Sequence, residues 1–247
     1  MTGQARSPVP RLVEAAATGI VGGVLGHLAT RPLKLGTAGA AVGALNGLLG
    51  GGRGVYDWKS ARGRTAFLLD STWGIVGTAG ALVVHAVNAV VGGEYVPALS
   101  RRRGYHVYVG GLRVRRGFTT AIGNAITSAD GGGGAAALDP SSERGRRRIR
   151  LVERHEALHV WQSRSFGPLF PVLYGAWLVG GALVAVALWS ARRGRRLFPI
   201  VETVAYYDNP FEWWAYKRDS NWPPSGADPS FVWRSRAKEN ARRSDAE

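Results

Sequence analysis

Residues 154–162 read RHEALHVWQ, and this stretch decides what kind of domain the chain contains. His155 and His159 are four residues apart, so on an α-helix their side chains project from the same face, one turn apart. Two imidazoles at this spacing can bind one tetrahedral Zn²⁺. Glu156 follows the first histidine and is placed to take a proton from zinc-bound water. We therefore predict a zinc helix, with His155 and His159 as metal ligands and Glu156 as the catalytic base.

A zinc site needs a third protein ligand, and the composition narrows the choice. The chain of 247 residues has no cysteine and five histidines, none of them after His159. We therefore expect a carboxylate from a later helix, and Glu212 is the first choice because Asn209 can cap a helix there and Pro210 fits its first position. Two alternatives stay open: Glu202 is the ligand, or neither glutamate is. Glu212 could also serve only to complete a capping box with Asn209.

The residues around this element resemble a known group of proteins. HExxHVWQ at 155–162, a following apolar segment and YYDNPFEWWAY at 206–216 look like poorly characterised bacterial HExxH proteins of gluzincin type, over roughly residues 95–224. The resemblance implies a zinc metallopeptidase-like protein with the same two histidine ligands and the same base, and with Glu212 as the third ligand. Gly123-Asn124 also looks like part of the strand that precedes the zinc helix in that group.

Residues 1–93 are rich in glycine and contain three apolar stretches, at 12–29, 35–51 and 72–93. The first two predict a membrane-embedded helical hairpin, and the third predicts a further span of about 20 residues. His85 in the third stretch is either a functional group or a neutral histidine hydrogen-bonded between helices. In the second stretch glycines recur every four residues, which predicts a glycine zipper whose faces also allow homo-oligomers: Gly39, Gly43, Gly47 and Gly51.

Short strands are expected between the apolar region and the zinc helix. Residues 105–109 and 112–116 flank Gly110-Gly111 and predict a β-hairpin with a two-residue turn. Residues 117–127 predict another strand pair or an edge strand. The predicted fold class is therefore α+β and mainly α, with glycine-rich apolar helices followed by a small β-hairpin and zinc-helix domain.

The expected domains are the apolar region at 1–93, the HExxH domain at 94–224 and a polar, charged tail at 225–247. Residues 168–190, inside the second domain, are the most hydrophobic stretch and are long enough as a helix to span a membrane. A single crossing would separate the histidines from Glu212. We therefore expect either an apolar helix that does not cross or a re-entrant hairpin that breaks at Gly180-Gly181.

The charge balance bears on location and partners. The formal net charge is +15, and basic residues flank the apolar segment on both sides. This pattern favours a bacterial inner membrane with the HExxH domain on the cytoplasmic side. Nucleic acid is not expected as a partner, because the aromatic residues lie in apolar runs rather than among the arginines.

These features together predict a membrane-attached, zinc-dependent metallopeptidase-like hydrolase. Its cofactor would be Zn²⁺, and its partners would be the lipid membrane and a peptide or protein substrate. The alternative is a non-catalytic glycine-zipper protein that oligomerises in the membrane, with the HExxH helix serving a structural role.

Overall fold

The computed structural model describes residues 8–112, 114, 118–128, 138–191 and 196–232. It is mainly helical with one small four-stranded sheet, which agrees with the predicted α+β, mainly α fold class. The chain divides into two compact units, Met1–Pro168 and Leu169–Glu247.

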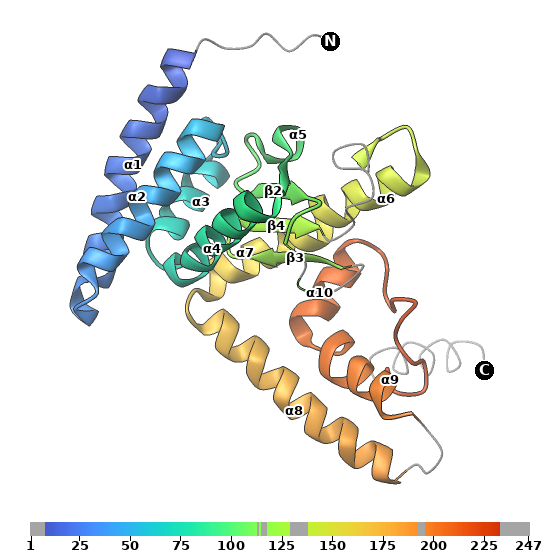
Figure 1. Cartoon of the computed structure of the whole chain (residues 1–247). Helices are drawn as coiled ribbons and strands as arrows, with labels where there is room; N and C mark the ends of the chain where they lie inside the picture. The colour runs from blue at the N-terminus through green and yellow to red at the C-terminus, as the bar shows by residue number, and fades with distance from the viewer. Residues whose placement is uncertain (1–7, 113, 115–117, 129–137, 192–195, 233–247) are drawn as a thin grey trace. The chain divides into compact units, whose positions relative to one another are not determined.

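The first unit begins with a tightly packed helical hairpin. Helices α1 (Pro8–Thr30) and α2 (Gly36–Arg53) are joined by the short 3₁₀ helix η1 (Arg31–Leu33) and lie side by side (Figure 1). Their backbones approach so closely that a Cβ added to Gly43 would lie 2.0 Å from the carbonyl oxygen of Gly22. The hydroxyl of Thr18 also donates to the carbonyl oxygen of Gly47 across the hairpin, at 2.6 Å. The two helices thus form a hairpin, as predicted, and glycine is what allows their close contact; that the hairpin is embedded in a membrane stays a prediction.

Two further helices follow the hairpin. Helix α3 (Ala61–Ser71) and helix α4 (Ile75–Val91) meet at an angle of 87°. Among the described residues, two helices are long and apolar enough to cross a membrane: Val9–Leu33 and Leu169–Ala191. A third span exists only if α3 and α4 together form one bent span, because α4 alone has 17 residues.

The sheet has the strand order β1-β2-β4-β3. Strand β2 pairs antiparallel with β1 and parallel with β4, whereas β3 and β4 form an antiparallel hairpin through the turn at Gly123-Asn124. Gly123 has a φ of 56°, which suits glycine. The strand pair predicted within 117–127 is thus present, and its Gly-Asn pair forms the turn rather than a strand. The strands are β1 (Glu94–Tyr95), β2 (His106–Val109), β3 (Thr119–Ile122) and β4 (Ala125–Ser128).

The predicted hairpin between 105–109 and 112–116 is wrong. Strand β2 takes its partners from elsewhere, and Leu112 lies outside any strand. The reason is the side chain of Asn88 on α4, whose Oδ1 accepts the backbone N–H of Leu112 at 3.0 Å and directs the chain onto that helix. Residues 113, 115 and 116 of the predicted strand lie outside the described residues.

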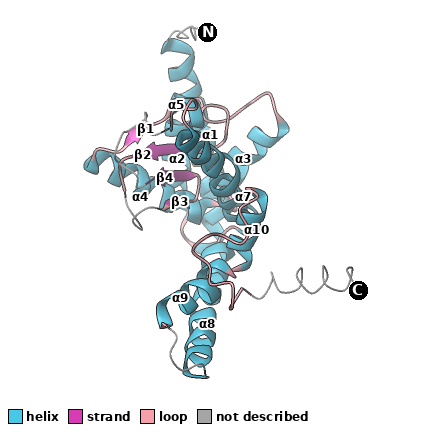
Figure 2. Ribbon diagram, turned by 90° about the vertical axis from the view of Figure 1, so that its right-hand side faces the viewer, coloured by secondary structure: helices cyan, strands magenta, loops and turns pink. Residues whose placement is uncertain are grey.

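The sheet is covered by helices on both faces. Ala81 and Val84 of α4 pack against Ala125 on one face. On the other face, the core formed by β2 and Ile126 packs against Val152, Ala157 and Val160. These three residues belong to a continuous helical run, which lies near the magenta strands in Figure 2. The run consists of α6 (Glu143–Arg150), the π-helix η3 (Leu151–Glu156) and α7 (Ala157–Phe166); the four-residue helix α5 (Pro97–Ser100) completes this unit.

The second unit is built on one long apolar helix. Helix α8 (Leu169–Ala191) runs without a break through Gly180-Gly181, so it is not the broken helix that a re-entrant hairpin needs. Gly181 is where the following segment packs, since a Cβ there would lie 2.6 Å from the Cα of Ala205. The unit continues with α9 (Leu197–Val201), the π-helix η4 (Glu202–Tyr207) and α10 (Pro210–Arg218). Residues 233–247 of the predicted tail lie outside the described residues.

Candidate metal centre

The HExxH element lies where the π-helix η3 passes into α7. The Nε2 atoms of His155 and His159 are 3.2 Å apart, and both side chains are buried. Two ligand nitrogens on a tetrahedral zinc ion are separated by about 3.3 Å when each bond is about 2.0–2.1 Å long. Val152 and Val160 of the same run pack into the core of the sheet. This packing fixes the helix, and the two imidazoles converge as a pair of metal ligands would.

Gln162 orients the second histidine. Its Oε1 lies 2.7 Å from Nδ1 of His159, and both side chains are buried. An oxygen acceptor at Nδ1 favours the tautomer with the proton on that nitrogen, which leaves the Nε2 lone pair available to a metal. Gln162 was not among the predicted site residues. Its position three residues after His159, on the same helix face, was the signal that could have identified it.

Glu212 lies in the first turn of α10 and is buried. Asn209 is the N-cap of this helix, and its Oδ1 accepts the backbone N–H of Phe211 at 3.1 Å. The backbone N–H of Asn209 donates to the carbonyl oxygen of Tyr206, so it is satisfied without a capping box from Glu212. Instead, Oε1 of Glu212 accepts a hydrogen bond from the hydroxyl of Tyr174, with the two oxygens 2.7 Å apart. The N-cap prediction is confirmed, while the purely capping role for Glu212 is not.

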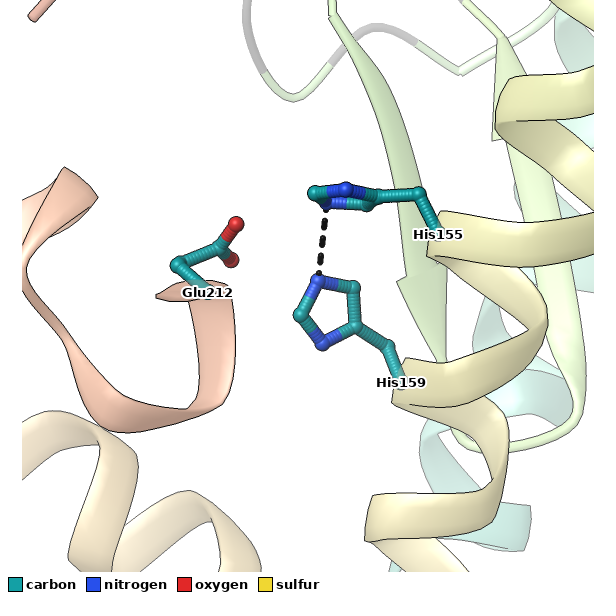
Figure 3. A group of neighbouring side chains, drawn as sticks. All are labelled: His155, His159 and Glu212. Carbon is teal, nitrogen blue, oxygen red and sulfur yellow. Dashed lines mark hydrogen bonds between the residues drawn. The ribbon is translucent and has the colours of Figure 1, made fainter. Parts of the chain in front are cut away.

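His155, His159 and Glu212 form a buried group that could hold a metal ion. One potential ligand atom from each residue lies within 4.8 Å of the other two (Figure 3). The alternative ligand, Glu202, is not a member of this group. Its Oε1 accepts a hydrogen bond from the hydroxyl of Tyr207, with the two oxygens 3.2 Å apart. The two nitrogens and one carboxylate oxygen suit a metal that accepts imidazole and carboxylate ligands, as zinc does.

The helix that carries the histidines is anchored by a buried ion pair. Arg164 of α7 is 1% exposed, and its Nε and Nη2 each donate to a carboxylate oxygen of Asp70 on α3 at 2.7 Å. Burial alone would lower the pKa of Arg164, but the charge of Asp70 outweighs it, so the pKa is raised and the guanidinium stays charged. Tyr56 and Asn124 donate to the same carboxylate, at 2.9 and 3.0 Å. Asn124 thus links the Gly-Asn turn, through the Asp70 carboxylate, to Arg164 of α7.

The other histidines are not part of this group. His85 hydrogen-bonds through Nδ1 to the hydroxyl of Tyr108 at 2.8 Å, as expected for a histidine that serves packing between elements. His106 packs edge-on against His85 and is fully buried. Burial is the main reason that the pKa of His106 lies well below its usual value, and the nearby His85 and Arg53 lower it further. The imidazole of His106 is therefore neutral. His27 is exposed on α1.

Comparisons with known proteins add no relative. No protein-family model, no curated protein and no solved structure matches this chain.

Proposed function

We propose that this protein is a membrane-attached, zinc-dependent metallopeptidase-like hydrolase. The observation that carries the proposal is the pair of buried imidazoles with Nε2 atoms 3.2 Å apart, in one group with the carboxylate of Glu212. His155, His159 and Glu212 are the proposed ligands. Two nitrogens and one oxygen leave a fourth tetrahedral position free for water or substrate, which is the arrangement of catalytic rather than structural zinc sites.

The residues of this chain have distinct proposed roles in hydrolysis. When bound, Zn²⁺ supplies a Lewis acid that lowers the pKa of water and polarises a carbonyl. Glu156, buried beside the first ligand, accepts the proton of the attacking water and passes it to the leaving amine. Gln162 keeps His159 in the tautomer that presents Nε2 to the metal. Burial of all these side chains excludes bulk water from the reacting groups.

The proposed location follows from the apolar helices. Val9–Leu33 and Leu169–Ala191 are long and apolar enough to insert in a bilayer, which supports membrane association. The excess of arginine in the segments around the HExxH element favours the cytoplasmic side of a bacterial inner membrane. A peptide or protein is the proposed substrate, because the HExxH glutamate serves amide hydrolysis.

Replacing the base tests the enzymatic proposal. We expect Glu156→Gln to lower hydrolysis of fluorescein-labelled casein by about 100-fold or more while zinc content stays at the wild-type level. Glu153→Gln is the matched control, since it removes only a half-exposed ion pair with Arg103 and should leave turnover nearly unchanged. Full activity in Glu156→Gln would show that Glu156 is not the base.

A second candidate is a non-catalytic membrane protein that acts through its glycine faces. The backbone contact between Gly22 and Gly43 favours it, because helices packed this closely are typical of glycine-zipper assemblies. Zinc content separates the two functions. A purified protein that binds no zinc but forms stable oligomers in bilayers would support this candidate over the hydrolase.

A further inference from the structure

Two aromatic side chains of α8 pack on the first turn of α10 within the second unit. Phe170 and Tyr174 are four residues apart, so they lie on the same face of α8. Both rings contact the ring of Phe211, with centroids 5.1 Å apart for Phe170 and 6.1 Å apart for Tyr174. Phe211 directly precedes the proposed metal ligand Glu212 in the sequence. The start of α8 and the turn that carries this ligand therefore form one packed contact.

The hydroxyl of Tyr174 extends this contact to the carboxylate itself. It donates to Oε1 of Glu212, with the two oxygens 2.7 Å apart, a separation typical of a hydroxyl that donates to a carboxylate. The side chain of Glu212 is 3% exposed, so bulk water contributes little to holding its charge. A hydrogen bond from a ring that is itself packed therefore restricts where this carboxylate can lie.

Such a restriction matters for a metal ligand. A glutamate side chain has several rotatable bonds, and a carboxylate that is already oriented binds a metal without first losing that conformational freedom. Groups that hydrogen-bond to a metal ligand orient it in this way, and removing such a group typically weakens metal binding by about 10- to 100-fold. Tyr174 has the geometry of such a group toward Glu212.

A second tyrosine–glutamate pair in the same unit provides a comparison. The hydroxyl of Tyr207 donates to Oε1 of Glu202, with the two oxygens 3.2 Å apart, but Glu202 is not in the group that could hold a metal. Tyr207 and Glu202 are five positions apart in the sequence, whereas 38 positions separate Tyr174 from Glu212. The Tyr174 pair therefore links α8 to a proposed ligand, and the Tyr207 pair does not.

We infer that Tyr174 is a positioning residue for Glu212, and that the apolar helix α8 thereby takes part in metal binding although none of the proposed ligands lies on it. This inference rests on the proposed function, because it concerns the third ligand of that same site. The hydroxyl orients the carboxylate, whereas the ring packs. Tyr174→Phe separates these two contributions, since it removes the hydroxyl and keeps a ring to contact Phe170 and Phe211.

Zinc affinity, measured on the purified full chain by competition with a chromophoric chelator, tests the inference. Tyr207→Phe is the matched control for Tyr174→Phe, because each variant loses one hydroxyl that donates to a glutamate. Tyr174→Phe is also made in a Glu212→Gln background, which asks whether the hydroxyl acts through that carboxylate. Thermal unfolding of the metal-free proteins shows whether the fold itself has changed.

We expect Tyr174→Phe to weaken zinc binding by about 10- to 100-fold and Tyr207→Phe to change it by less than about twofold. The metal-free unfolding temperatures of these two variants should be similar. In the Glu212→Gln background, where the third ligand is already lost, Tyr174→Phe should change zinc affinity by less than about twofold.

The inference is overturned if Tyr174→Phe binds zinc as tightly as the wild type, or if Tyr207→Phe loses as much affinity. It is also overturned if the loss persists in the Glu212→Gln background or comes with a lower unfolding temperature than that of Tyr207→Phe. In each of these cases the wild type still binds zinc, so the proposed function stands. A wild type that binds no zinc removes the proposed function and the inference with it.

Discussion

At the scale of single residues, the contact between Gln162 and His159 should make the proposed metal site sensitive to a side chain that is not itself a proposed ligand. We predict that Gln162→Ala weakens zinc binding by about 10- to 100-fold, because the imidazole loses the acceptor that fixes its tautomer and orientation. Competition with a chromophoric zinc chelator measures this change.

Gln162→Glu is the control for this prediction. It keeps an oxygen acceptor near Nδ1 of His159, so its zinc affinity should remain close to that of the wild type or become tighter. If the alanine variant bound zinc as tightly as the glutamate variant, Gln162 would have no part in orienting the ligand.

The same residue scale shows what spacing alone can predict. The sequence contains the HExxH interval and the Asn209-Pro210 helix start, and both are local patterns. Tyr174 could not be predicted as the partner of Glu212, because the two are 38 positions apart and only the packing of α8 brings them together. Asp70 and Arg164 are separated by 94 positions for the same reason.

At the scale of elements, a π-helix lies at or shortly before each of the two places in the chain that carry the proposed metal ligands. Segment η3 ends at Glu156 and includes His155, and η4 ends three residues before the first turn of α10. A π-turn shifts the side chains that follow it around the helix axis, and such turns are frequent at functional sites. The sequence predicted a regular helix here, since a period of 3.6 gives no sign of an inserted residue.

The hairpin of α1 and α2 should be intolerant of side chains at its contact. A Cβ at Gly43 would lie 2.0 Å from the carbonyl oxygen of Gly22, so we predict that Gly43→Ala destabilises the protein by about 1–3 kcal/mol. Gly52→Ala is the matched control on the same helix, because its nearest neighbour would be at an ordinary 3.7 Å. Thermal unfolding in detergent compares the two; equal melting temperatures would mean that the helices do not pack in this way.

The sheet illustrates why local strand signals were insufficient. Gly110-Gly111 between two runs of strand-forming residues is a hairpin pattern. In the structure, however, the backbone N–H of Leu112 donates to the side chain of Asn88, and β2 pairs in parallel with β4. This strand pairing depends on a residue of α4 that lies more than twenty positions away in the sequence, so the turn residues alone could not predict it.

At the scale of the whole molecule, a shared metal constrains the membrane topology. Helix α8 separates the histidines from Glu212 in the sequence and is long enough to span a bilayer. If it crossed once, its two flanks would face opposite compartments. The proposed zinc site therefore requires both flanks on the same side.

Cysteine labelling tests this topology directly, because the chain has no native cysteine. We predict that Ser165→Cys and Lys217→Cys, at two exposed positions on either side of α8, react with a membrane-impermeant maleimide from the same face of oriented vesicles. Labelling from opposite faces would mean that α8 crosses the membrane and that the two histidines and Glu212 do not share a metal.

Zinc-edge X-ray absorption of the purified full chain, with zinc content measured on the same sample, tests the central claim most directly. We predict about one zinc per chain, bound by nitrogen and oxygen ligands with an imidazole signature, greatly reduced in Glu212→Gln and retained in Glu202→Gln. A wild-type protein without zinc, or a Glu212→Gln variant with an unchanged spectrum and zinc content, would contradict the assignment of His155, His159 and Glu212 as the metal site.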